Sequence, residues 1–181
     1  MITIRQERAA DAAAREALLD AAYGSARFGK PSERLRARRR PAEGLSFVAV
    51  EDSAIVGTLR LWDVTAGFAR PALLLGPLAV HPDRQRRGIG SALMRHALRQ
   101  ASRRGHGAVL LVGDAAYYGR FGFSAERTAK LWLPGLNARH RLLGCELRAE
   151  ALAGAGGRIV EANLPAPRLP ARTRRLAPQA A

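Results

Sequence analysis

One stretch of the chain carries most of the information about its fold: LAVHPDRQRRGIGS, residues 78–91. An apolar strand ends at Val80, a tight loop follows, and a helix begins at Gly88 and Gly90. The first turn of a helix has free backbone N–H groups, and the helix dipole favours negative charge there. The glycines let phosphate oxygens approach the backbone because no Cβ stands in the way. The stretch therefore predicts an anion site that a pyrophosphate would fit.

Other phosphate-binding turns have patterns that this chain lacks. It has no G-x-x-x-x-G-K-[ST] sequence, and no G-x-G-x-x-G sequence with an acidic residue about 20 positions further on. The structural alternative is a glycine pair that only lets the helix pack closely against a sheet.

The segments around this stretch predict a mixed α/β domain. Hydrophobic periodicity predicts helices at 11–22, 32–40 and 88–104, with Asp11 and Ser32 as caps of the first two. The same criterion predicts strands at 1–5, 45–50, 55–62, 73–80, 108–112 and 142–148. Gly76 and Pro77 interrupt the fourth of these strands, and a proline inside a strand favours a bulge or an edge.

A chain of 181 residues is long enough for one compact domain, which we expect at 1–150. Residues 151–181 form a Gly-, Pro- and Arg-rich extension, of which 165–181 are expected to be disordered. The apolar stretches are too short to cross a membrane, and the first residues lack the features of a secretory signal. These features predict a cytoplasmic protein.

The composition argues against several other classes of protein. Cys145 is the only cysteine, and no Cys/His spacing indicates a metal site. The formal net charge of +15 comes mainly from arginines spread over the whole chain, so it does not favour nucleic acid as the partner. Such a surface would attract coenzyme A, and it argues weakly for an acidic or neutral acceptor over a polycation.

Two motifs resemble those of the GNAT acetyltransferase superfamily. The family pattern Q/R-x-x-G-x-G/A corresponds to residues 85–90, QRRGIG. A tyrosine four residues before Gly-Phe corresponds to Tyr118 before Gly122 and Phe123. The resemblance covers about residues 2–148, and residues 113–123 are similar to a small stand-alone bacterial subgroup of predicted acetyltransferases.

The resemblance implies a fold and a cofactor site. The fold is a mixed, mostly antiparallel sheet with a splayed, bulged strand, flanked by helices. That strand pairs with the pantetheine arm of acetyl-CoA, and the helix N-terminus holds the pyrophosphate. The cofactor-binding residues are then Leu78, Ala79, Val80, Gln85, Arg86, Arg87, Gly88, Ile89, Gly90 and Ser91. No metal is implied.

The implied reaction is direct attack of an amine on the thioester, with Tyr118 as the proton donor to the departing thiolate. Tyr117 is the alternative donor, and core packing is the structural alternative for Tyr118. The central strands lack the glutamate that many relatives use as a base, so Asp114, Asp63 and a water chain remain open.

The acceptor is a small-molecule or protein amine, and dimers are common among relatives, which leaves a homodimer open. Alternative functions are an acyl-CoA-binding sensor or partner protein without catalysis and a nucleic-acid-binding accessory protein. The four histidines are expected at the surface, and Cys145, Trp62 and Trp132 are expected to serve packing. The alternatives are a covalent acyl carrier for Cys145 and the lining of the acceptor pocket for the two tryptophans.

Overall fold

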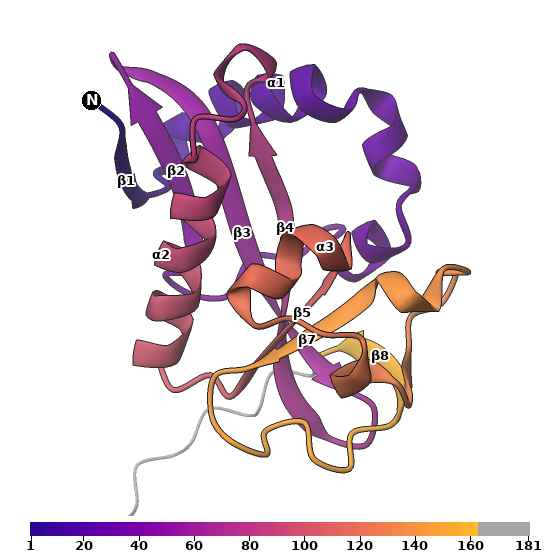
Figure 1. Cartoon of the computed structure of the whole chain (residues 1–181). Helices are drawn as coiled ribbons and strands as arrows, with labels where there is room; N and C mark the ends of the chain where they lie inside the picture. Colours follow the sequence, from indigo (N-terminus) through magenta and orange to yellow (C-terminus); the bar gives the residue numbers. More distant parts are fainter. Residues whose placement is uncertain (163–181) are drawn as a thin grey trace, which may run out of the picture.

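The computed structural model describes residues 1–162, which form one open sheet with helices on both faces (Figure 1). The strands are β1 Thr3–Gln6, β2 Ser46–Glu51, β3 Ala54–Ala66, β4 Arg70–Val80, β5 Ala108–Val112, β6 Leu131–Trp132, β7 Leu142–Glu146 and β8 Gly157–Glu161. The helices are α1 Ala12–Tyr23, α2 Ile89–Arg103 and α3 Ala115–Tyr118. The main sheet order is β1-β2-β3-β4-β5-β7, in which only the β4–β5 pair is parallel. This confirms the predicted mixed, mostly antiparallel sheet.

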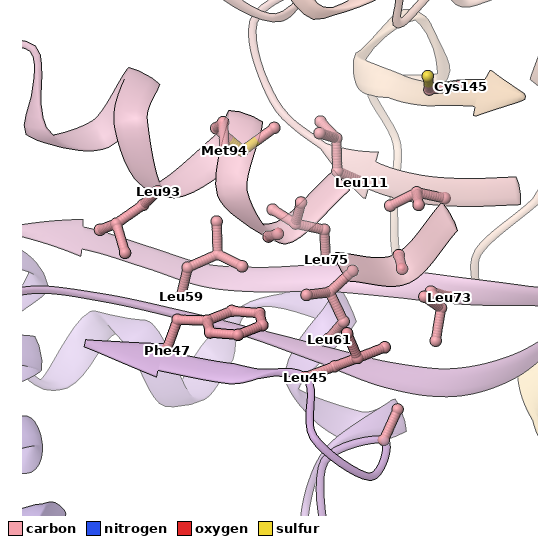
Figure 2. Packing of buried hydrophobic residues seen from close by; sticks show 14 of the residues in the cluster. Leu45, Phe47, Leu59, Leu61, Leu73, Leu75, Leu93, Met94, Leu111 and Cys145 are labelled. Atoms are coloured by element: carbon pink, nitrogen blue, oxygen red, sulfur yellow. The ribbon is translucent and has the colours of Figure 1, made fainter. Parts of the chain in front are cut away.

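Helix α2 packs its apolar side on one face of the sheet. Leu93 and Met94 are fully buried against strand residues such as Leu59 and Leu75 (Figure 2). Gly57 of β3 lies so close to this helix that an added Cβ would stand 2.9 Å from Leu93. Helix α1 covers the opposite face (Figure 1), where it contacts β3 and β4. The two layers hold the end of β4 and the start of α2 in fixed positions.

Strands β4 and β5 pair only briefly and then separate. Their parallel register covers Leu73 with Val109 and Leu74 with Leu110. Beyond these pairs β4 continues to Val80, and no other strand among residues 1–162 pairs with it on that side. The sheet is therefore splayed, as the family resemblance implies.

The predicted bulge lies on the splayed part of β4. The β3–β4 register passes from Leu61 opposite Leu75 to Leu59 opposite Leu78, so Gly76 and Pro77 face a single residue of β3. The peptide bond between Gly76 and Pro77 is cis. The indole nitrogen of the buried Trp62 donates to the carbonyl oxygen of Gly76 at 2.5 Å. The bulge is thus tied to the neighbouring strand.

The prediction of a helix at 32–40 is wrong. A short 3-10 turn, Pro31–Leu35, overlaps only the start of this segment, and Ser32 lies inside the turn, not at its cap. Arg38 has a left-handed backbone (φ 59°), and Arg39 donates to the carbonyl oxygens of Leu35 and Asp63. Crowded arginines that contact other parts of the fold compete with regular helix formation here.

Asp11 does not cap α1 with its side chain, contrary to the sequence prediction. Its carboxylate accepts hydrogen bonds from the Arg5 guanidinium, at 2.6 and 2.9 Å, and from the backbone N–H of Arg8, at 2.7 Å. The guanidinium of Arg5 and the Arg8 amide lower the pKa of this carboxyl. Asp11 therefore fastens the start of α1 to β1.

The sheet continues past residue 150, where the sequence predicted an extension. Strand β8 pairs antiparallel with β3, for example Thr65 with Val160, and parallel with β6. Ile159 is fully buried. The predicted disordered segment 165–181 lies outside the described residues. Within residues 1–162 no helix has the length and apolar character needed to cross a membrane.

Candidate active site

The loop before α2 has the backbone geometry of an anion site. Arg86 and Gly88 both adopt left-handed conformations, with φ of 62° and 78°. The helix begins at Ile89, and its first internal hydrogen bond runs from the Ala92 N–H to the Gly88 carbonyl at 2.9 Å. Successive amides in such a turn point to one side and create a concave site for negative charge. The backbone from Arg86 to Ser91 makes up this turn and the first turn of α2.

A cavity of about 450 Å³, here called the loop cavity, opens beside this turn. Most of the predicted cofactor residues line it: Leu78, Val80, Gln85, Arg86, Gly88, Ile89, Gly90 and Ser91. Tyr23, Arg84, Tyr117 and Arg120 complete the wall. A Cβ on Gly90 would stand 3.2 Å from the Tyr117 hydroxyl, so the glycine keeps this wall open.

Two predicted residues do not reach the loop cavity. Ala79 is buried and pairs with Thr58 of β3. The Arg87 guanidinium forms hydrogen bonds of 2.8 and 3.0 Å with the two carboxylate oxygens of Glu51. The side chains of Ala79 and Arg87 therefore do not line the cofactor site, and at these two positions only the backbone remains as predicted.

Glu51 was missed by sequence reasoning. Its carboxylate also accepts from Nε of Arg84 at 2.8 Å, so it binds two of the three arginines of the loop. The hydrogen bonds from Arg87, and then those from Arg84, lower the pKa of Glu51. The residue lies more than thirty positions before the loop, and no local pattern indicates the contact. Glu51 thus holds the loop through Arg84 and Arg87, whereas Arg86 has no such ion pair within residues 1–162.

A second, narrow cavity of about 90 Å³ lies where β4 and β5 separate. We call it the splay cavity. Residues of both separating strands, of two helices and of the loop after α1 line it. They are Leu75, Gly76, Pro77 and Leu78 of β4, Leu111 and Val112 of β5, Tyr23 of α1, Tyr118 of α3, and Arg27, Lys30, Ser32, Glu33 and Arg36 of the loop. Leu78 and Tyr23 line both cavities. The two cavities therefore follow one another along the splayed part of β4.

Tyr118 is placed at the splay cavity by the short helix α3. Asp114 caps this helix, since its Oδ1 accepts from the Ala116 N–H at 3.0 Å. A Cβ on Gly113 would come within 2.2 Å of the Tyr118 ring, so only glycine fits before the helix. Burial raises the pKa of Tyr118 to about 12, which keeps the phenol neutral and able to donate a proton.

The alternative donor, Tyr117, lines the loop cavity instead. Its ring packs edge-on against that of Tyr118, with 4.9 Å between the centroids. The geometry therefore separates the two tyrosines: Tyr117 lies beside the loop before α2, and Tyr118 lies where β4 and β5 separate.

Neither carboxylate considered as the base lines these cavities. Asp114 caps α3, and Asp63 lines a different cavity together with His106. The carboxylate on the wall of the splay cavity is Glu33, which the sequence did not single out. It forms an ion pair of 2.9 Å with Nη2 of Arg36.

The cysteine and the two tryptophans considered in the sequence lie outside both cavities. Cys145 and Trp62 are buried, as expected, whereas Trp132 is 41% exposed and its expected packing role is wrong. Trp132 lies in the two-residue strand β6, with the Arg158 guanidinium 6.0 Å from its ring centroid. Among residues 1–162 no three His, Cys, Asp or Glu side chains come together as metal ligands would.

Comparisons with known proteins agree with this geometry. Residues 42–125 match the family model described as an acetyltransferase (GNAT) domain. The chain is similar to the GNAT family N-acetyltransferase YhbS from Escherichia coli, solved in complex with CoA, with 27% identity over 89% of each chain and a TM-score of 0.75.

A GNAT family acetyltransferase from Brucella melitensis, solved in complex with acetyl-CoA, is 38% identical over 70% of this chain and 84% of its own, with a TM-score of 0.60. The ribosomal-protein-S18-alanine N-acetyltransferase from Escherichia coli, at 20% identity and a TM-score of 0.58 over 82% of this chain and 95% of its own, shares the fold. A comparison with curated proteins finds no match.

Proposed function

The chain belongs to the GNAT family and is an acetyl-CoA-dependent N-acetyltransferase, and from this premise we propose that it acetylates a primary amine of a small molecule or a protein by direct attack in a ternary complex. The observation that carries the proposal is the succession of two cavities along one splayed strand. One cavity ends at a turn suited to phosphate, and the other ends at a neutral tyrosine.

The cofactor would lie along β4. Its pyrophosphate would accept hydrogen bonds from the amides between Arg86 and Ser91, where the helix dipole adds favourable potential. Its pantetheine arm would pair with the unpartnered edge from Leu78 to Val80, as an additional strand does. This arrangement brings the thioester to the splay cavity.

The reaction requires one bond to form and one to break. The acceptor amine attacks the thioester carbon in its neutral form, and a backbone amide of the bulged strand stabilises the oxyanion. As the C–S bond breaks, the attacking nitrogen gives up one proton to a water chain, Tyr118 donates its proton to the thiolate of CoA, and the phenol regains a proton from the same water. Burial raises the pKa of Tyr118, so the phenol is in its protonated form throughout the physiological range.

The test combines cofactor binding with turnover. We expect acetyl-CoA to raise the midpoint of thermal unfolding, because a ligand that binds only the folded state stabilises it by RT ln(1 + [L]/Kd). We also expect that some amines in a panel of primary amines are acetylated, which releases the free thiol of CoA from acetyl-CoA.

Stabilisation by acetyl-CoA without turnover of any amine would contradict the proposed reaction and favour the sensor alternative. Absence of any stabilisation would contradict the assigned cofactor site. Binding to nucleic acid that weakens steeply with salt, without an effect of acetyl-CoA, would favour the third class considered.

A further inference from the structure

Arg36 is a buried cation on the wall of the splay cavity. It follows the turn Pro31–Leu35, and its side chain is only 6% exposed. Burial of a guanidinium is costly unless its charge and its N–H groups find partners. The contacts of Arg36 meet this requirement only in part.

Within residues 1–162 the side-chain hydrogen bonds of Arg36 are confined to one nitrogen. Nη2 lies 2.9 Å from a carboxylate oxygen of Glu33 and 3.2 Å from the hydroxyl of Ser32. Nε is buried and has no hydrogen-bond partner in the described part of the chain. Nη1 lies beside the bulge, where a Cβ on Gly76 would stand 2.9 Å from it. Nη1 is therefore the donor of Arg36 that lies beside the bulge, close to the place where the thioester would lie.

The charge around Arg36 is also incompletely balanced. Lys30 lies on the same wall, and burial followed by the nearby Arg36 and Arg141 lowers its pKa. Burial likewise lowers the pKa of Arg36. Glu33 is the acidic residue on this wall, and it is shared by these cations. A site with this balance favours an anion.

The third cation of the wall is different, because its charge is already neutralised. The Arg27 guanidinium lies 2.6 Å from a Glu16 oxygen and 3.0 Å from an Asp20 oxygen. Arg27 therefore provides a matched control: the same residue type on the same cavity, with its donors engaged.

We propose that the acceptor amine belongs to a molecule that also carries a carboxylate, as an amino acid does, and that Arg36 binds this carboxylate in the splay cavity. The inference rests on the proposed function. A carboxylate is compact enough for a cavity of about 90 Å³, and its planar oxygens match the donors of a guanidinium. Tyr118 lines the same cavity, so a carboxylate held at Arg36 keeps the rest of a small acceptor close to the reaction.

The first experiment uses the unchanged protein. Common amino acids are compared with their carboxamides, which keep the amine and the side chain but lose the negative charge, and kcat/KM is measured by thiol release. We expect the acids to exceed the matched amides by about tenfold to a hundredfold, as for a hydrogen bond to a charged group.

Variants then identify the residue responsible for this preference. Arg36→Gln and Arg36→Met should abolish the acid-to-amide ratio, Arg36→Lys should restore part of it, and Arg27→Gln should keep it. Glu33→Gln should keep or increase the ratio, because it removes a carboxylate that competes for the same guanidinium.

Each outcome tests either the carboxylate site at Arg36 or the proposed acetyltransferase function. Equal turnover of acids and amides by the unchanged protein would overturn the inference and leave the proposed function intact. An equal loss for both acceptors in Arg36→Gln would also overturn it, because Arg36 would then serve the thioester and not the acceptor. If acetyl-CoA stabilises the protein and no acid is a substrate while uncharged amines are, the inference is again wrong. Failure of acetyl-CoA to bind at all would instead contradict the proposed function.

Discussion

The hydroxyl of Tyr23 donates a hydrogen bond to the carbonyl oxygen of Leu78. Tyr23 is the last residue of α1, and Leu78 lies on the splayed part of β4 between the two cavities. Nζ of Lys30 lies 3.9 Å from the centre of the same tyrosine ring. The bond therefore fastens α1, and the loop that carries Lys30 and Arg36, to the strand that would receive the pantetheine arm.

Tyr23→Phe should lower the free energy of unfolding by about 1 kcal/mol, because a hydrogen bond between the helix and β4 is lost. For a chain of this size the melting temperature should fall by about 2–4 °C. The affinity for acetyl-CoA should not decrease, since the Leu78 carbonyl becomes free to pair with the cofactor. A variant that melts like the original protein but loses acetyl-CoA binding would show that Tyr23 contacts the cofactor directly.

Gly88→Ala should remove stabilisation by acetyl-CoA. Alanine at a φ of 78° costs about 1–2 kcal/mol, and a Cβ enters the space expected for the pyrophosphate. Gly105→Ala is the matched control, since Gly105 has a φ of 83° at the other end of α2 and also has no atom within 4 Å of an added Cβ. Both variants should unfold at a lower temperature than the original protein. Only in Gly105→Ala should acetyl-CoA still raise the midpoint of thermal unfolding. Equal responses would argue against the assigned phosphate site.

Tyr118→Phe should lower kcat by at least about a hundredfold, the lower range for a lost general acid, and leave acetyl-CoA binding intact. Tyr117→Phe serves as the control in the same kinetic assay and should keep most of its kcat. A full loss in Tyr117→Phe with normal turnover in Tyr118→Phe would exchange the roles of the two tyrosines.

The raised pKa of Tyr118 also predicts a dependence of stability on pH. The folded state holds this proton up to about pH 12, whereas an unfolded tyrosine loses it near about pH 10. The contribution is thus fully present below about pH 10 and is lost as the pH rises towards 12. Between about pH 9 and about pH 11 the original protein should lose more stability in denaturant titrations than Tyr118→Phe does. Identical losses would show that the phenol is not buried in solution.

Glu51→Gln should make acetyl-CoA binding more dependent on salt. The change frees Arg84 and Arg87 from a carboxylate that accepts hydrogen bonds from both, and two released guanidinium groups add to the field that attracts the cofactor phosphates. The slope of log Kd against log salt concentration, measured by calorimetry, should become steeper. An unchanged slope would indicate that the two arginines stay in place without Glu51.

Much of the fold could be predicted because its signals are local. The apolar stripe of α2, the two runs with strand character in β2 and β3, and the short apolar run of β5 each determine their element within a few residues. The turn between β4 and α2 follows in the same way, since it depends on adjacent residues.

The features that were missed depend on contacts between distant parts of the chain. Glu51 and its arginines lie more than thirty positions apart, and Trp62 reaches the bulge from another strand. The basic segment 34–40 has helical composition, but Arg36 turns inwards to the splay cavity and Arg39 bonds to β3. β8 is a short strand in a Gly-rich region, and its pairing with β3 stabilises it more than its own composition does.

The early end of the β4–β5 pairing means that this sheet has inner edges as well as outer ones. Exposed strand edges invite pairing with strands of other molecules, and proteins protect them with prolines, bulges or covering segments. Pro77 lacks an N–H group, the neighbouring backbone is bulged, and Tyr23 is bonded to the next residue of β4. The residues that shape the cofactor path therefore also keep this gap in the sheet from recruiting a foreign strand when no cofactor fills it.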